Sequence, residues 1–180
     1  MLRRRLLKLS WLVALVLPIA LGQGVSGMPG TEGETLSGKR VHLNEVVAGH
    51  ATVLVMGFSK EAGDGCTDWA RAVRGDTALK GAQVWGVAML AGAPGFIRGV
   101  IKAGMRKGLS PAEQDAFVVL ERDEQPWRAY FGVVNDKEPQ VALLDTRGKV
   151  VGRGHGMARE FEGELRAAFV IAGGQAVGQR

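Results

Sequence analysis

Residues 51–58 have the sequence Ala-Thr-Val-Leu-Val-Met-Gly-Phe, a continuous apolar run rich in β-branched side chains. Such a run is typical of a central strand that is buried on both faces of a sheet. A second apolar run, Gln-Val-Trp-Gly-Val-Ala-Met-Leu, covers residues 83–90. Between the two runs, the sequence predicts a helix from Cys66 or Thr67 to Leu79. Two buried strands joined by a helix form a β-α-β unit with a parallel strand pair.

The segments on either side of this unit extend the same sheet. Further strands are predicted at residues 39–43, 116–120, 139–145 and 149–153, and further helices at 94–107, 123–130 and 158–171. Residues 110–113, Ser-Pro-Ala-Glu, have the pattern of a capping box with proline at the first helical position. The sequence therefore predicts an α/β fold, with a mixed sheet flanked by helices and an inserted amphipathic helical segment.

The amino terminus has the pattern of a secretory signal. Arg3, Arg4, Arg5 and Lys8 precede an apolar stretch that runs from Leu9 to Leu21, too short to span a bilayer comfortably. We expect a signal peptide at residues 1–22, a glycine-rich linker at 23–35, one domain at 36–172 and a flexible tail at 173–180. An uncleaved leader that anchors the protein is the alternative. Either way, the predicted location is the periplasm or the outer face of the cytoplasmic membrane.

Charge and cysteine content narrow the function classes. The chain has 23 Lys and Arg against 18 Asp and Glu, but four of the basic residues and none of the acidic ones lie in residues 1–22. The rest of the chain is nearly neutral, so nucleic acid is not expected as a partner. Cys66 is the only cysteine, and no internal disulfide can form. The thiol is therefore buried, free and reactive, or paired with another molecule.

The segment around Cys66 is similar to a family motif. Gly63-Asp64-Gly65-Cys66 resembles a Cys-X-X-Cys motif whose first cysteine is replaced by glycine, and it follows a central strand at the start of a predicted helix. With the β-α-β and β-β-α halves, it resembles the thioredoxin-like superfamily, in its extracytoplasmic redoxin branch. The resemblance covers about residues 36–172 and places Pro139 where that superfamily keeps a cis-proline beside the active-site loop.

Other stretches are similar to a narrower family. Residues 96–109, 117–120, 127–145, 148–152 and 154–156 resemble the thioredoxin-like assembly factor of mitochondrial ATP synthase. That resemblance implies a membrane-associated, chaperone-like role without a thiol cycle.

Two interpretations of Cys66 are open. Cys66, Trp69 and Val73 share one helical stripe, which favours a buried thiol that acts only as a small apolar side chain. Alternatively, the amino terminus of the helix lowers the pKa of the thiol and makes it a nucleophile. A thiol peroxidase is less favoured, because residues 59–66 lack the proline and threonine that those enzymes place before their cysteine.

The predicted helix at 94–107 is amphipathic. Arg98, Lys102 and Arg106 recur at helical spacing on one side of it, and such a basic face can contact a membrane surface or a partner protein. A helix packed on the sheet with a solvated basic edge is the alternative. Gly99, Gly104 and Gly108 weaken this helix.

Two function hypotheses follow. The first is a non-catalytic factor that binds a protein client, such as a membrane complex under assembly, through Gly63, Asp64, Gly65, Pro139 and the three basic residues. The second is a thiol-dependent oxidoreductase in which Cys66 forms mixed disulfides. Neither hypothesis requires a cofactor, and His42, His50 and His155 are too scattered in the sequence to suggest a metal site.

Overall fold

A computed structural model describes residues 27–171, and the expected signal peptide at 1–22 and tail at 173–180 lie outside this range. The strands are β1 (Glu32–Thr35), β2 (Arg40–His42), β3 (Thr52–Gly57), β4 (Gln83–Met89), β5 (Phe117–Leu120), β6 (Gln140–Leu144) and β7 (Val150–His155). The helices are α1 (Leu43–Val46), α2 (Ala62–Gly75), the 3-10 turn η1 (Thr77–Leu79), α3 (Gly95–Lys107), α4 (Pro111–Asp115), α5 (Glu124–Phe131) and α6 (Ala158–Ile171).

All seven strands form one mixed sheet in the order β2-β1-β5-β4-β3-β6-β7. Strands β3, β4 and β5 run parallel, whereas β6 is antiparallel to β3 and to β7. The predicted β-α-β unit is therefore β3-α2-β4, and the predicted hairpin with its following helix is β6-β7-α6. The α/β fold class is confirmed.

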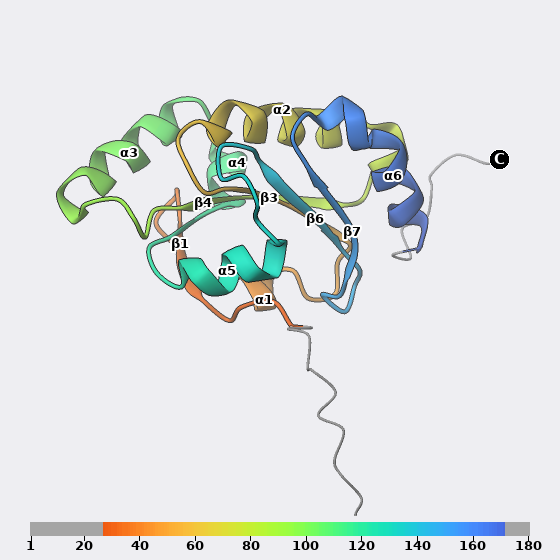
Figure 1. The fold of residues 1–180 in the computed structure, drawn as a ribbon, viewed down its shortest axis with the longest axis horizontal. Coiled ribbons are helices and arrows are strands. Elements are labelled where there is room, and N and C mark those ends of the chain that lie inside the picture. The colour runs from red at the N-terminus through yellow and green to blue at the C-terminus, as the bar shows by residue number, and fades with distance from the viewer. Residues whose placement is uncertain (1–26, 172–180) are drawn as a thin grey trace, which may run out of the picture.

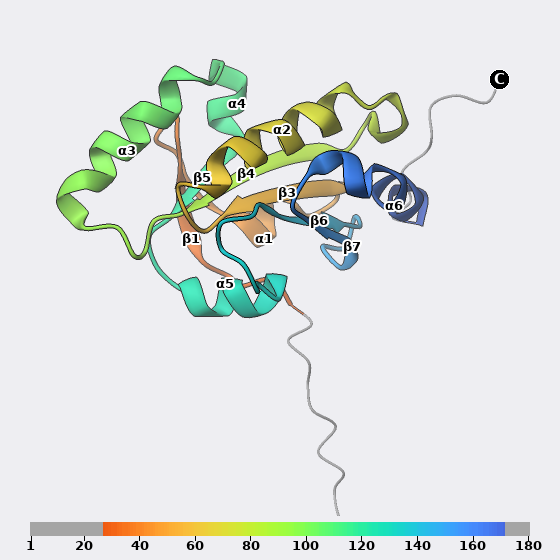
Figure 2. The ribbon, with the colours of Figure 1, turned by 45° about the horizontal axis from the view of Figure 1, so that its top comes forward.

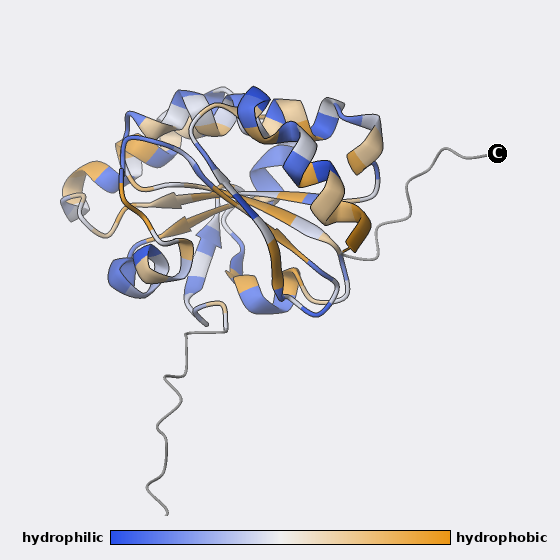
Figure 3. Cartoon of the chain, turned by 45° about the vertical axis from the view of Figure 1, so that its right-hand side comes forward, coloured by the Kyte–Doolittle hydropathy of each residue, from blue (hydrophilic) through white to orange (hydrophobic). Residues whose placement is uncertain are grey.

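Helices cover both faces of the sheet (Figures 1 and 2). Successive residues of β3 point to opposite faces, because side chains alternate along a strand. Val53 and Val55 pack against α2 and α6, whereas Leu54 and Met56 pack against α1 and α5. Both layers contain a buried tryptophan, Trp69 in α2 and Trp127 in α5. The apolar strands in the middle of the molecule are visible in Figure 3.

The sheet begins earlier than the sequence indicates. Strand β1 lies inside residues 23–35, the range expected to be a linker, so the expected linker and domain boundary at residue 36 is too late. β1 pairs with both β2 and β5. Gly33 faces β5, where a Cβ atom would overlap Val118 Cγ1, so only glycine fits there without rearrangement. Just before β1, the Thr31 hydroxyl donates to Asp123 and accepts from the Trp127 indole.

Two other boundaries differ from expectation. Helix α2 begins at Ala62, four residues before Cys66, and ends at Gly75 rather than continuing to Leu79. Asp76 breaks it with an extended backbone, and its carboxylate accepts a hydrogen bond from the Ala78 N–H of η1.

The capping box is confirmed: the Ser110 side chain accepts from the Glu113 N–H, and the Glu113 carboxylate accepts from the Ser110 N–H. None of the helices within residues 27–171 is long and apolar enough to cross a membrane.

Candidate functional site

The candidate site lies at the end of the sheet where the parallel strands have their carboxyl ends. The carboxyl end of β3, the amino end of β6 and the carboxyl end of β7 meet there, because Met56 pairs with Gln140 and Gln140 pairs with His155. Helix α2 begins at this edge, five residues after β3 ends. The Ser59 hydroxyl accepts a hydrogen bond from the Ala62 N–H, at 3.3 Å, and so satisfies one free donor of the first turn.

The four residues predicted as a degenerate motif form the first turns of α2. Gly63 and Asp64 are exposed, and a Cβ atom at Gly63 would meet nothing within 4 Å. Gly65 faces the opposite way, toward the buried ring of Pro139, the residue before β6. The structure thus brings Gly63, Asp64, Gly65, Cys66 and Pro139 together at one place, as the sequence predicts. The 27–171 range contains no cis peptide bond, so Pro139 follows a trans bond and not the cis bond that the resemblance implies.

Gly65 permits a close contact between α2 and Pro139. A Cβ atom at Gly65 would lie 2.9 Å from Cγ and 3.0 Å from Cδ of Pro139, closer than such atoms pack. We expect Gly65→Ala to destabilise the fold by about 1–3 kcal/mol, because a proline ring cannot rotate away. The matched control is Gly63→Ala, which gains up to about 1 kcal/mol because it adds no clash and favours helix. Urea unfolding of both variants measures this difference, and equal stabilities would contradict the contact.

Cys66 is the fifth residue of α2, and its side chain points toward the sheet. Its Sγ lies 3.2 Å from where a Cβ atom of Gly57 would be, at the end of β3, and it packs on the cluster that contains Trp69 and Val73. The thiol is half-buried, and its removal from water raises the pKa of Cys66 from 9.0 to about 12. The expectation that the helix amino terminus lowers this pKa is wrong. The unpaired N–H groups belong to the first four residues of a helix, and Cys66 follows them.

A polar group that the sequence does not single out lies beside this turn. His155 Nδ1 is 3.0 Å from Glu138 Oε2, and the Asn135 amide donates to the other carboxylate oxygen of Glu138 at 2.8 Å. Both hydrogen bonds lower the pKa of the Glu138 carboxyl, and the bond with His155 has the larger effect. The Trp69 indole donates to the Gly156 carbonyl at 2.8 Å and ties α2 to the end of β7.

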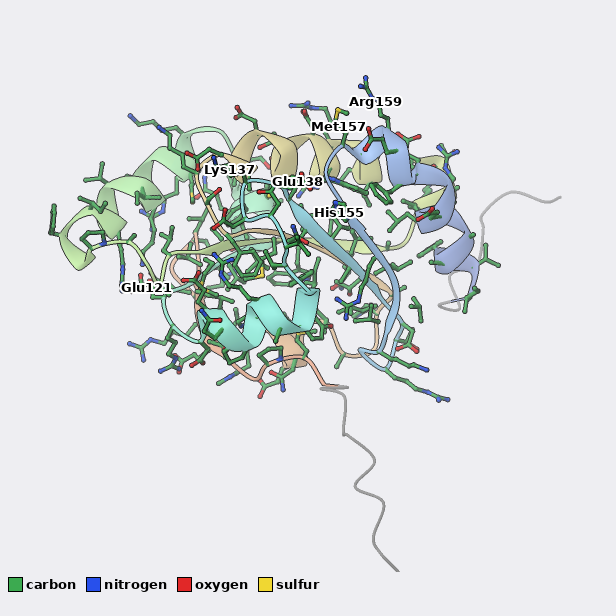
Figure 4. The ribbon with its side chains drawn as sticks, viewed as in Figure 1. Glu121, Lys137, Glu138, His155, Met157 and Arg159 are labelled. Atoms are coloured by element: carbon green, nitrogen blue, oxygen red, sulfur yellow. The ribbon has the colours of Figure 1, made fainter. Side chains whose placement is uncertain are left out.

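Charged and polar side chains gather around the start of β6 and the end of β7. Figure 4 shows Lys137 and Glu138 before β6, His155 at the end of β7, and Met157 and Arg159 after it, and all except the half-buried Glu138 are exposed. The only sequence signal for the group is the pair of glycines on either side of His155. We call the surface formed by Gly63, Asp64, Lys137, Glu138 and His155 the rim. The rim has charged groups of both signs. The pocket between β7 and α6 and the pocket around the end of α2 both lie away from it.

The three basic residues of α3 that are predicted to bind a partner point into the fold. Arg98 donates to the carbonyls of Ala91 and Ala93. Arg106 donates to the carbonyl of Leu36 at 2.6 Å. Arg98 also pairs with the Glu121 carboxylate, at 3.0 Å. Arg98 and Arg106 therefore attach α3 to the segments beside it.

Lys102 is the most enclosed of the three. Its Nζ lies 2.8 Å from Glu34 Oε2 and 2.9 Å from Glu121 Oε1, with the lysine side chain only 14% exposed. The hydrogen bonds that Lys102 donates to these two carboxylates raise the pKa of Lys102, and Lys102 in turn lowers the pKa of Glu121. In the sequence, Glu34 stands 68 residues before Lys102, so periodicity within the helix could not reveal the pair.

Residues that could bind a metal ion do not come together. Within residues 27–171, no group of three His, Cys, Asp or Glu side chains is close enough to hold one. Chemically, the candidate site offers one protonated thiol beneath an open helix amino terminus, surrounded by groups that can hydrogen-bond a polypeptide.

The fold is thioredoxin-like. No family model matches the sequence, and no curated protein matches it. Among solved structures, the chain resembles a putative thiol:disulfide interchange protein DsbE from Chlorobium tepidum, with a TM-score of 0.55 and 19% identity over 82% of this chain and 95% of that one. It also resembles a thio-disulfide isomerase from Thermus thermophilus, with a TM-score of 0.51 and 21% identity over 82% of this chain and 95% of that one.

A third similar structure is BsSco, a member of the Sco family of cytochrome c oxidase assembly proteins. Its TM-score is 0.52 at 13% identity, over 78% of this chain and 92% of that one. At these identities, the likeness shows the fold alone. The comparisons show a thioredoxin-like fold and give no support to the narrower resemblance to the ATP synthase assembly factor.

Proposed function

We propose that this protein binds a protein client on a thioredoxin-like scaffold without catalysing thiol-disulfide exchange. One observation carries the proposal. The exposed position at the start of α2 holds Gly63, and the only thiol of the chain lies beneath it with a pKa of about 12. A thiol with that pKa stays protonated at physiological pH, and the thiolate is the reactive form.

The proposed location is the cell envelope, and the proposed role is assembly of a membrane complex. The basic and apolar leader at residues 1–22 supports export. Similar folds serve in that setting: one is described as an exposed lipoprotein thioredoxin from Streptococcus pneumoniae, with a TM-score of 0.51. BsSco supports an assembly role, because its family is described as cytochrome c oxidase assembly proteins. The sequence resemblance to the ATP synthase assembly factor points the same way.

The rim is the surface that we assign to the client. It combines the open space over Gly63 with charges of both signs on Asp64, Lys137 and Glu138. A polypeptide that lies across this edge would meet side chains able to donate and to accept hydrogen bonds. Such a surface gives specificity by charge complementarity more than by burial of apolar area.

The test is crosslinking in the native envelope, followed by identification of the bound protein. We expect Cys66→Ser to capture the same partner as the natural protein, within about twofold in yield, because the thiol is not used. Lys137→Glu should lower the yield about tenfold, since it reverses a charge on the rim. The matched control is Lys80→Glu, an exposed lysine beyond the far end of α2. Loss of capture in Cys66→Ser, with circular dichroism unchanged, would refute the proposal.

A thiol-dependent oxidoreductase is the second candidate. It is favoured by the half-burial of Cys66, which leaves part of the side chain accessible. In that case, a partner would be bound through a mixed disulfide that disappears on reduction. Capture that depends on Cys66 and is reversed by dithiothreitol would therefore select this candidate over client binding.

A further inference from the structure

Helix α3 turns cationic side chains toward the domain and leaves large apolar side chains exposed. Its cationic side chains Arg98, Lys102 and Arg106 face the domain, whereas Phe96 is 86% exposed and Val100 is 74% exposed. No residue of α3 is buried. A helix on the surface of a monomeric domain normally turns its apolar stripe inward and its charges outward.

The inward side of α3 is held firmly enough to keep this orientation. Besides the cation contacts, Ile101 and Met105 pack against the small cluster of Leu36, Leu90 and Val119. The exposure of the outward side chains is therefore not caused by a helix that has lost contact with the domain. It is a surface that the fold presents.

The outward face of α3 is apolar, small and uncharged along most of its length. Around Phe96 and Val100 lie Gly95, Gly99, Ala103 and Gly104, all exposed, and the three glycines have nothing within 4 Å of an added Cβ atom. Residues 92–110 contain no Asp or Glu. Figures 1 and 2 show α3 at one end of the molecule, and no other element within residues 27–171 lies over its outer side. We call this surface, formed by residues 95, 96, 99, 100, 103 and 104, the α3 face.

Size argues against a second copy of the chain as the partner. A helix of 13 residues is about 20 Å long, so two α3 faces packed together would bury about 200–400 Å² each. A stable interface buries about 800 Å² per partner. The α3 face alone is too small for a stable dimer, and its partner must also contact another part of this protein.

Charge argues against a lipid surface. Helices that lie on anionic membranes use lysine and arginine to bind the headgroups. Here Lys102 is neutralised by Glu34 and Glu121, Arg98 shares Glu121, and Arg106 binds a backbone carbonyl. Lys107, at the carboxyl end of α3, is the one exposed cation of the helix. The glycines instead permit close approach of another backbone, as between packed helices.

We propose that the α3 face binds an uncharged, apolar helix of the same client that contacts the rim. This inference rests on the proposed function. The rim and the start of α3 lie at the same end of the sheet. This is because α2 follows the carboxyl end of β3, α3 follows the carboxyl end of β4, and these strands are parallel. A client that covers both surfaces gains the area that the α3 face lacks.

The experiment places the photo-crosslinking residue benzoylphenylalanine at position 96 of the full chain in its native envelope. A second probe occupies position 157, which is exposed beside the rim, and a control probe occupies position 45, which is exposed on α1. Cross-linked peptides are then sequenced. We expect positions 96 and 157 to capture the same protein, and position 96 to link to an apolar stretch of it without charged residues. Position 45 should not capture that protein.

A paired substitution tests the energetic role of the α3 face. With the probe at position 157, Phe96→Glu should lower the cross-link yield at least tenfold, whereas Lys80→Glu, away from both surfaces, should change it less than twofold. Links from position 96 only to a second copy, to residues 1–26 of the same chain, to lipid or to nothing would overturn the inference. If position 157 still captures a client in that case, the proposed function stands. If neither probe captures one, both fail.

Discussion

Gly63→Cys gives a protein that forms an internal disulfide with Cys66 when treated with oxidised glutathione. Residues three apart in a helix have Cα atoms about 5 Å apart, within the range that a disulfide spans. The added side chain enters open space, since a Cβ atom at Gly63 meets nothing within 4 Å. It lies in the first turn of α2, where unpaired N–H groups lower the pKa of a thiol.

The chemistry of that variant proceeds in two steps. The thiolate at position 63 attacks glutathione disulfide and releases one glutathione thiolate, which leaves a mixed disulfide. The sulfur of Cys66, after loss of its proton to solvent, attacks the sulfur at position 63 and releases the second glutathione. Mass spectrometry should show a loss of two hydrogens, and dithiothreitol should restore them. The natural protein should form no internal disulfide under the same conditions.

A double variant provides the control. Gly63→Cys combined with Cys66→Ser should stop at the mixed disulfide, because no second sulfur can resolve it. If the single variant also stops there, Cys66 cannot reach position 63, and the assignment of Gly63-Asp64-Gly65-Cys66 to the Cys-X-X-Cys position is wrong.

The central part of the fold could be predicted from the sequence because its signals are local. The apolar runs of β3 and β4 are continuous, so their burial follows from composition alone, and the hairpin of β6 and β7 has a glycine turn. The sequence predicts too late a start for α2, because Gly63 and Gly65 weaken a helix. Packing of Gly65 on Pro139 favours this geometry and overrides that preference, and it involves a residue 74 positions away.

The errors at β1 and α3 have a different cause. The residues of β1 that face inward are Gly33 and Thr35, so the strand is buried without an apolar pattern to reveal it. For α3, periodicity correctly groups the basic residues on one side, but it cannot say which side faces the domain. That depends on Glu34, Glu121 and the carbonyl of Leu36, which come from distant segments. The site thus needed the structure for its rim and for the α3 face.

Cys66 of the folded protein should react with iodoacetamide at pH 8 about fiftyfold more slowly than Cys66 in urea. Burial raises the pKa of Cys66 from 9.0 to about 12, which lowers the thiolate fraction about a thousandfold. A thiolate of higher pKa is more nucleophilic, and this effect raises the reaction rate about twentyfold. In the folded protein, the rate should keep rising about tenfold per pH unit through pH 10, whereas in urea it levels off near pH 9. Equal rates at pH 8, or a folded-state plateau below pH 9, would contradict the raised pKa.

The same pKa difference should appear in stability. Below pH 9 the thiol is protonated in both states and adds no pH dependence. Between pH 9 and 12 the unfolded chain loses this proton while the folded protein keeps it, so the free energy of unfolding falls by up to about 1.4 kcal/mol per pH unit. Cys66→Ala lacks this loss. Burial also raises the pKa of Tyr130 to about 12, but both proteins share that effect. Urea unfolding at pH 8, 9 and 10 should therefore show the natural protein losing stability faster than Cys66→Ala. Parallel losses would mean that folding does not protect the proton of Cys66, and would reopen the thiol-dependent function.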